Sequence, residues 1–224
     1  MQRRYRLFIL LTGVVVEATA VIVIIRAFCP SGNPLFAAVL KNDADKVYRC
    51  IRDGQNPNVK NELGLTPLHF AAANGLERCA EALLDSGASI DLADNKGNTA
   101  LHFAALDNRV RMVKLLLENG ARPNVRNSCG EAPLHFAAGN LGRASAEALL
   151  GGGALVDPVD AKGRTPLFGA VNFGDDPTVV LLVQHGASLS VKDAEGKGLV
   201  DVADGKTRTV DLLSRLATQP SSVE

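Results

Sequence analysis

A fixed spacing of 33 residues constrains this chain more than any other feature. Glycine recurs at five positions that are 33 residues apart, namely Gly64, Gly97, Gly130, Gly163 and Gly196. A second set keeps the same spacing, and an alanine follows each of its members: Gly87, Gly120, Gly153 and Gly186. A constant period of this length is typical of a solenoid, in which each unit buries its apolar face against the next unit.

One unit reads as two short helices joined by glycine turns. Thr66 suits the N-cap of a helix, and Pro67 suits the first helical position because the missing N–H has no helical partner there. Gly75 is expected to end this helix in a left-handed conformation. A second amphipathic helix is expected over Leu76–Asp85, and the turn Ala93–Gly97 leads into the next unit.

The helix start carries a specific motif. The stretch TPLHFA at Thr66 returns as TALHFA at Thr99 and APLHFA at Ala132, each 33 residues further along the chain. With this motif and this period the chain resembles the ankyrin repeat family. The resemblance implies an all-α ankyrin-repeat solenoid of helix-turn-helix units, with β-hairpin or turn fingers between them.

On this register the chain divides into segments that we expect to be distinct. Residues 1–28 form a membrane anchor or signal segment, 29–32 a linker, 33–217 the repeat domain and 218–224 a disordered tail. The repeat domain comprises a degenerate first cap, four full units and a shortened C-terminal cap, at residues 33–63, 64–96, 97–129, 130–162, 163–195 and 196–217. Atypical end units are expected because an end unit has one face without a neighbour.

The N-terminal segment is strongly apolar. Leu7–Ile25 contains nineteen residues, of which thirteen are Leu, Ile, Val or Phe and one, Glu17, is charged. Roughly 20 apolar residues cross a bilayer as a helix, so we expect one N-terminal hydrophobic helix through residues 7–25. The basic residues Arg3, Arg4 and Arg6 favour a cytoplasmic N-terminus. The repeat domain would then be membrane-anchored and extracytoplasmic, or periplasmic if the source is bacterial.

Two alternatives remain for this segment. Ala18-Thr19-Ala20 fits a signal-peptidase site, and cleavage there would leave a secreted or periplasmic soluble protein that begins at Val21. The segment could also be a buried helix of a soluble protein.

Three histidines follow the repeat, at His69, His102 and His135. One repeat step is a helix-packing distance of about 8–10 Å, whereas Zn–N bonds are about 2.0–2.1 Å long, so these rings cannot share a metal ion. The resemblance implies that each imidazole bonds the backbone of the neighbouring turn. Phe36 and Phe168 occupy the same register position, which favours a structural ring over an acid or base.

No other pattern in the chain indicates catalysis. The sequence contains no nucleophile elbow, phosphate-binding loop, HExxH, CxxC or dinucleotide fingerprint. The regularly spaced carboxylates of Asp94, Asp160 and Asp193 are expected to initiate turns. We therefore expect a protein that is not an enzyme, with no cofactor, metal or small-molecule substrate, and we keep a hydrolytic or metal enzyme as a remote alternative.

The charge balance narrows the class of partner. Lys+Arg and Asp+Glu both total 24, and this balance argues against nucleic acid as a partner.

Cys50 and Cys79 fall at inward positions of second helices, where buried thiols are expected, and Cys129 falls in a finger turn. A disulfide between Cys50 and Cys79 stays open at this point.

The resemblance also implies where a partner protein binds. Ankyrin arrays resemble a cupped hand, with turns as fingers and first helices as a palm, and variable residues at both places make the contacts. The binding hypothesis comprises the finger residues Leu65, Asn98, Glu131 and Arg164 and the palm residues Asn74, Asp107, Asn140, Asn172 and Phe173. The fingers also carry Glu62, Asn95, Ser128 and Lys162 at positions assigned in the same way.

Aromatic residues sharpen this hypothesis. Phe173 is expected to be exposed in the palm, beside Asn172 and across from Arg164 on the finger of the same unit. The ladder Phe70, Phe103 and Phe136 either packs between units or offers an apolar stripe to a partner.

The expected function is therefore a non-enzymatic protein–protein interaction module, whose partner is a protein of unknown identity. The architecture is similar to that of exported bacterial ankyrin proteins, which are linked to oxidative-stress defence or to the neutralisation of a co-produced toxin. An inhibitor or immunity protein that neutralises a co-produced enzyme or toxin is the alternative.

Overall fold

The computed structural model describes residues 6–7, 16–17, 33–203 and 205–218. Within these residues the chain forms twelve helices, labelled α2 to α13, and two strands of two residues each. The helices run over α2 Pro34–Leu40, α3 Ala44–Arg52, α4 Pro67–Asn74, α5 Glu77–Asp85, α6 Ala100–Leu106, α7 Val110–Glu118, α8 Pro133–Ala138, α9 Arg143–Gly151, α10 Pro166–Phe173, α11 Asp176–Gln184, α12 Leu199–Val202 and α13 Thr207–Thr218.

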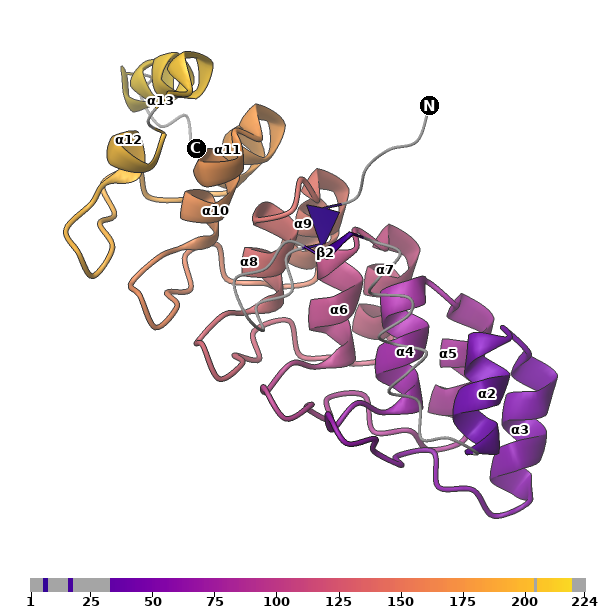
Figure 1. Ribbon diagram of the computed structural model, residues 1–224. Coiled ribbons are helices and arrows are strands. Elements are labelled where there is room, and N and C mark those ends of the chain that lie inside the picture. The colour runs from indigo at the N-terminus through magenta and orange to yellow at the C-terminus, as the bar shows by residue number, and fades with distance from the viewer. Residues whose placement is uncertain (1–5, 8–15, 18–32, 204, 219–224) are drawn as a thin grey trace.

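The helices form two rows in an elongated array. The first helices of the units (α2, α4, α6, α8, α10 and α12) follow one another in one row, and the second helices lie behind them (Figure 1). The main helix contacts join the two helices of one unit, or equivalent helices of adjacent units. The fold is thus an all-helical solenoid in which each unit is held by its neighbours.

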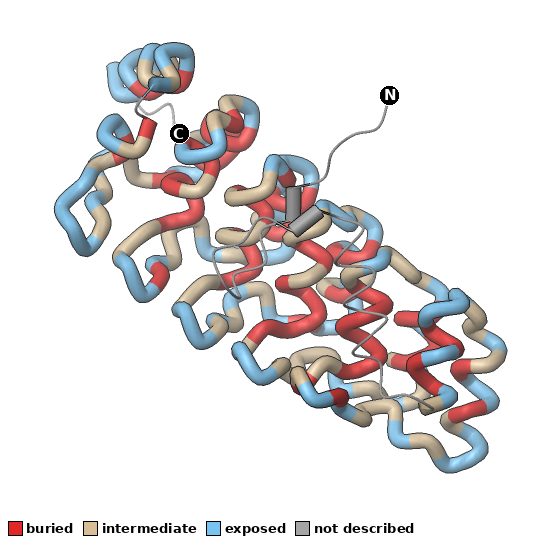
Figure 2. The backbone as a smooth tube through the Cα atoms, viewed as in Figure 1, coloured by how far each residue is buried: buried red, intermediate tan, exposed pale blue. Residues whose placement is uncertain are grey.

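The core is a ladder of small and branched side chains. Leucine occupies the same inward position of five successive first helices and is at most 2% exposed at each of them: Leu35, Leu68, Leu101, Leu134 and Leu167. The equivalent ladder of the second helices begins with Cys50 and continues with Leu83, Leu116, Leu149 and Leu182. Buried backbone runs along the whole array rather than around one centre (Figure 2).

Local signals set the helix boundaries as the sequence indicates. Thr66 is the N-cap of α4 and Pro67 its first residue, and Gly75 ends the helix with φ of 66°. In α11, Pro177 stands at the second helical position. Asp175 is the N-cap, and its carboxylate accepts hydrogen bonds from the backbone N–H and hydroxyl of Thr178. Asp176 instead accepts a hydrogen bond from Thr209 and pairs with Arg208, both from α13.

The loops between units form the fingers, which project together from the array on the side of the first helices (Figure 1). A side chain at the base of each finger accepts hydrogen bonds from the backbone of the turn. Asp94 and Asp160, for example, each accept backbone N–H groups from residues two and four positions later, at 2.8–2.9 Å. This confirms the expected turn role of the spaced carboxylates.

Adjacent fingers are also joined through their backbones. In each pair an N–H of the later finger donates to a carbonyl oxygen of the earlier one at 2.8–3.0 Å: Asn95 to Leu63, Ser128 to Lys96, Ala161 to Cys129 and Ala194 to Lys162. These bonds fix the spacing of the fingers.

The structure does not support the expected N-terminal hydrophobic helix. The described part of this segment is β1, Arg6–Leu7, paired antiparallel with β2, Val16–Glu17. The remainder of residues 7–25 lies outside the described residues. None of the helices that the structure describes is both long enough and apolar enough to cross a membrane.

The structure distinguishes a disulfide between Cys50 and Cys79 from two free thiols. Cys50 and Cys79 are both buried and both carry free thiols. The Cys79 thiol lies 3.6 Å from the side-chain oxygen of Asn42, and burial raises its pKa. Cys129 is free and exposed at a finger turn. A bridge between Cys50 and Cys79 is therefore not part of this fold.

Candidate functional site

The three repeated histidines join successive units. His69 Nδ1 accepts the backbone N–H of Thr66 at 3.0 Å, and its Nε2 lies 3.0 Å from the carbonyl oxygen of Asn98 in the next unit. His102 makes the same pair of bonds, with its Nε2 3.1 Å from the carbonyl oxygen of Glu131. A backbone N–H can only donate and a carbonyl can only accept, so each ring is neutral with its proton on Nε2.

This geometry indicates a structural role for the three histidines rather than a catalytic or metal-binding role. Burial lowers the pKa of His102 to about 4, although the bond to Glu131 opposes the shift. Burial also lowers the pKa of His69 and of His135. Both ring nitrogens of each histidine are occupied by the protein, which leaves no nitrogen for a ligand. Among the described residues, no group of three or more His, Cys, Asp or Glu side chains is arranged to hold a metal ion.

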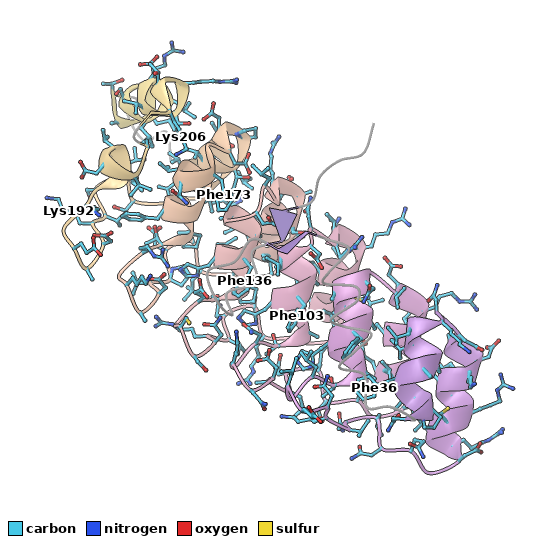
Figure 3. All side chains as sticks on the ribbon, in the orientation of Figure 1. Phe36, Phe103, Phe136, Phe173, Lys192 and Lys206 are labelled. Carbon is cyan, nitrogen blue, oxygen red and sulfur yellow. The ribbon has the colours of Figure 1, made fainter. Side chains whose placement is uncertain are left out.

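The phenylalanine ladder packs on these rings. Phe70 meets Phe36 edge-on with ring centroids 5.2 Å apart, and it is buried. Phe103 and Phe136 meet His69 and His102 in the same way, at 5.6 and 5.3 Å. Each ring therefore packs on the unit before it, as the packing alternative predicts. Phe103 and Phe136 are only partly buried, so one side of each stays open along the first helices (Figure 3).

The ladder stops after α8 because the next position is Gly169. A Cβ at Gly169 would lie 3.2 Å from the backbone of Gly139, a tighter contact than most Cβ atoms make, so α10 packs closely on the end of α8. Phe173, at the C-terminal end of α10, reaches back to Gly139, where an added Cβ would lie 4.0 Å from its Cε2. The missing ring of one unit is thus followed by an exposed ring one helical turn later.

The finger residues of the binding hypothesis divide into two groups. Glu62, Asn95, Ser128 and Lys162 are exposed. Asn98 is only 9% exposed, and its side chain bonds Asp94 and Asn127, so its assignment as an exposed contact residue is wrong. It is part of the finger base, where a short amide completes the turn.

Three further finger residues are also used by the fold. Leu65 is half-buried against the core. Glu131 accepts a hydrogen bond from Asn127 Nδ2 at 3.1 Å. Arg164 binds the nearly buried carboxylate of Asp160 with both Nε and Nη2, at 2.8 and 2.6 Å. Although burial pushes the pKa of Asp160 upward, the hydrogen bonds and charge of Arg164 hold it below its ordinary value. Arg164 is a strut of its finger rather than a free contact.

The palm residues of the hypothesis lie where the register places them, at the C-terminal ends of the first helices. Asn172 and Phe173 are exposed, and Phe173 shows 41% of its surface. Asn74 is exposed too, while its side chain donates to the Phe70 carbonyl at 2.8 Å. Asp107 and Asn140 are half-buried.

Leu141 is a surface residue that the sequence analysis missed. It follows Asn140 in the turn between α8 and α9, with φ of 58° and 61% of its surface exposed. The equivalent position of other units holds Asn42, Gly75, Asn108 or Gly174, residue types that tolerate the left-handed region. The 33-residue register contains this signal, because a leucine stands where asparagine or glycine is expected.

The sequence analysis also missed a second set of side chains that join adjacent units. One Asn or Asp per unit accepts the backbone N–H of a residue 31 positions later, at 2.7–3.1 Å: Asn58, Asp91, Asn124 and Asp157. These residues keep the 33-residue spacing, so the register could have found them.

The helix pairs stack into an array, and histidines that bond the backbone of the next unit join adjacent pairs. Side chains are exposed along the row of first helices. These features define a helical-repeat scaffold for binding. The family model for "Ankyrin repeats (3 copies)" matches residues 35–127 and 120–193. The chain belongs to the ankyrin repeat family, whose repeats form protein–protein interaction modules and are typically not enzymes.

Curated relatives match over short stretches. Potassium channel GORK of Arabidopsis thaliana is 43% identical over 60 residues, which cover 27% of this chain and 7% of that protein. Potassium channel KOR1 of Oryza sativa subsp. japonica is 41% identical over 64 residues, 29% of this chain and 8% of the channel. Ankyrin repeat domain-containing protein 31 of Homo sapiens is 42% identical over 52 residues, 23% of this chain and 3% of its own length. The chain thus corresponds to a small part of each of these proteins.

Proposed function

We propose that this protein binds another protein in the palm of its array, along the C-terminal ends of α6, α8 and α10. The observation that supports this most is Phe173, a large ring with 41% of its surface exposed, in a chain with only 4% aromatic residues. Exposed aromatic residues at the centre of a surface are where binding energy tends to concentrate. Figure 3 shows Phe103, Phe136 and Phe173 following one another along the row of first helices.

The proposal is tested by capturing the partner from the source cells. Full-length tagged protein is crosslinked, purified and analysed by quantitative mass spectrometry, in parallel with Phe173→Ala and Leu155→Ala. Leu155 is 62% exposed in the loop after α9, is not one of the palm residues, and serves as the matched control. The palm proposal expects the main partner to be depleted at least about tenfold by Phe173→Ala and retained by Leu155→Ala. Equal recovery with both variants would remove the palm as the binding site.

The same experiment separates a scaffold from an inhibitor. An inhibitor or immunity protein would recover one enzyme or toxin in stoichiometric amount, and the purified complex would suppress that activity. A scaffold would recover several proteins below stoichiometry. Arg164 is left out of this test because its loss would disturb a finger as well as a contact.

We also propose that the repeat domain lies outside the cytoplasm, held at the membrane by residues 7–25. The thirteen large apolar side chains and the preceding arginines support this location. Alkaline phosphatase fused after Glu224 should then be active, and the protein should stay with membranes at high pH. Inactive fusions would place the domain in the cytoplasm, and a soluble species that begins at Val21 would favour a cleaved signal peptide.

A further inference from the structure

The palm contains one carboxylate that the fold does not explain. Asp107 is the C-cap residue of α6 and is half-buried. Within the described part of the chain its carboxylate makes no hydrogen bond or ion pair. Arg109, the basic residue whose charge lowers the pKa of Asp107, makes no ion pair with it, and its Nε donates to the Ala73 carbonyl at 3.2 Å.

The location of Asp107 is unfavourable for a negative charge in two ways. Burial raises the pKa of Asp107 to about 6, against a small opposing effect of Arg109. The C-terminal end of a helix also carries partial negative charge on its free carbonyl groups, which repel an anion. A half-buried, unpaired carboxylate at a helix C-terminus costs stability and contributes none to the fold.

Neighbouring units show what the fold itself prefers at this position. The equivalent residues Asn74 and Asn140 donate their amides to backbone carbonyls, of Phe70 and Leu106 respectively. The first bond lies within α4 and the second reaches the preceding unit. An ionised carboxylate has no proton to donate, so Asp107 can make neither bond. The substitution of aspartate for asparagine thus removes a hydrogen bond and adds an uncompensated charge.

A second unfavourable residue lies in the following unit. Leu141 adopts φ of 58°, a conformation that costs a non-glycine residue roughly 1–2 kcal/mol, and it exposes most of its side chain. It is joined to Asp107 through Asn140, its chain neighbour, whose amide bonds the carbonyl of Leu106. Residues that break local rules without a structural gain are expected at functional sites.

The following residues stand at or just after the C-terminal ends of α6, α8 and α10, in three successive units, and we call them the palm patch: Leu106, Asp107, Asn140, Leu141 and Phe173. Phe173 completes it by extending over Gly139, the residue before Asn140. The palm patch therefore offers two exposed apolar side chains, Leu141 and Phe173, in the two units that follow a carboxylate that makes no hydrogen bond or ion pair among the described residues.

We propose that the palm patch binds a segment of the partner protein that carries a lysine or arginine between large apolar residues, with the cation paired to Asp107 and the apolar side chains against Leu141 and Phe173. This inference rests on the proposed function and names the chemistry of the partner. A partly desolvated ion pair supplies the charge complement that the fold lacks, and the apolar contacts exclude water around it.

The test uses a random 12-residue peptide library displayed on phage, selected against the full chain in mild detergent. Enriched peptides should contain Lys or Arg flanked by Leu, Ile, Val, Phe or Met. Each is then synthesised with its basic residue and with Gln in its place, and measured against wild type and Asp107→Asn. Asn is the residue of the equivalent positions 74 and 140, so this variant is expected to fold.

The expected result is a closed double-mutant cycle. Asp107→Asn should weaken the basic peptide at least about tenfold, and the Gln peptide should bind both proteins equally. Leu141→Gly and Phe173→Ala should weaken both peptides, and the matched control Leu155→Ala should weaken neither.

The failures of the two proposals are distinguishable. Peptides that lose binding with Phe173→Ala but lack a basic residue, or bind Asp107→Asn as tightly as wild type, would overturn the charge pairing and leave the palm as the site. Peptides that are indifferent to Phe173→Ala, Leu141→Gly and Asp107→Asn alike would overturn both proposals, as would the absence of any enriched peptide.

Discussion

His102 Nε2 lies 3.1 Å from the carbonyl oxygen of Glu131, which is 29 residues further along the chain and belongs to the next unit. The other ring nitrogen accepts the backbone N–H of Thr99, at the start of the same helix. One imidazole therefore ties a helix start to the finger of the following unit. Because solenoid units are held mainly by their neighbours, such ties determine the cooperativity of the array.

Removal of this tie should destabilise the protein without changing its chemistry. His102→Ala loses two hydrogen bonds and leaves buried backbone groups unsatisfied, so the free energy of unfolding should fall by about 2–3 kcal/mol. Urea unfolding followed by circular dichroism measures the change. His185→Ala, at the exposed C-cap of α11, is the control and should cost much less. Stoichiometric zinc in the purified wild type, lost in His102→Ala, would contradict the structural role.

The buried histidines should make the protein sensitive to acid. The folded pKa of His102 is about 4, below its ordinary value of 6.5, so the neutral ring contributes stability that is present above pH 6.5. That stability is lost as the pH falls from 6.5 towards 4, and the lowered pKa values of His69 and His135 add to the loss. Denaturant midpoints measured between pH 7.5 and 4 test this, and a midpoint that rises through that range as the pH falls would contradict it.

Asp107 should act in the opposite direction. Its folded pKa of about 6 exceeds the ordinary 3.8, so its contribution to stability is present below pH 3.8 and lost as the pH rises through 6. Asp107→Asn should therefore raise the free energy of unfolding at pH 7.5 by roughly 1–3 kcal/mol, and this gain should shrink as the pH falls towards 4. The same denaturant series measures both proteins. A variant less stable than wild type at pH 7.5 would show that the carboxylate has a structural partner.

Two threonines test the value of the histidine partner. The hydroxyl of Thr99 lies 3.0 Å from His102 Nδ1, whereas the buried hydroxyl of Thr165 has no partner among the described atoms, because Phe168 replaces the histidine. Thr99→Val should cost about 1 kcal/mol, and Thr165→Val should be neutral or slightly stabilising. Thermal unfolding of the two isosteric variants decides the comparison, and equal losses would show that the hydroxyl bond has no net value.

A pair of glycines separates backbone strain from finger stacking. Gly97 and Gly120 both have positive φ, of 80° and 87°, so alanine is strained at either position. Only at Gly97 would the added Cβ meet the next finger, 2.9 Å from the backbone nitrogen of Ser128. Gly120→Ala should cost about 1–2 kcal/mol and Gly97→Ala clearly more. Similar losses would mean that the fingers separate without cost.

The sequence by itself determined the family, the helix positions and the structural role of the histidines. The family and the helix positions follow from the 33-residue register and its repeated motif, because each signal appears several times. The resemblance to that family then implied the role of the histidines. The Leu ladder from Leu35 to Leu167 and the left-handed Gly75 are examples. The register also identified the palm positions, including the exposed Phe173.

Only the tertiary structure decided which surface residues are available to a partner. Asn98 and Arg164 occupy finger positions like their exposed neighbours, yet one is buried in a turn and the other is paired to Asp160. Asp107 has a carboxylate where Asn74 and Asn140 have amides that donate to backbone carbonyls, and the acceptor of Asn140 belongs to the preceding unit. The physical reason is that residue type and register are local properties, whereas burial, pairing and the cost of an unpaired charge depend on the side chains that the next unit brings into contact.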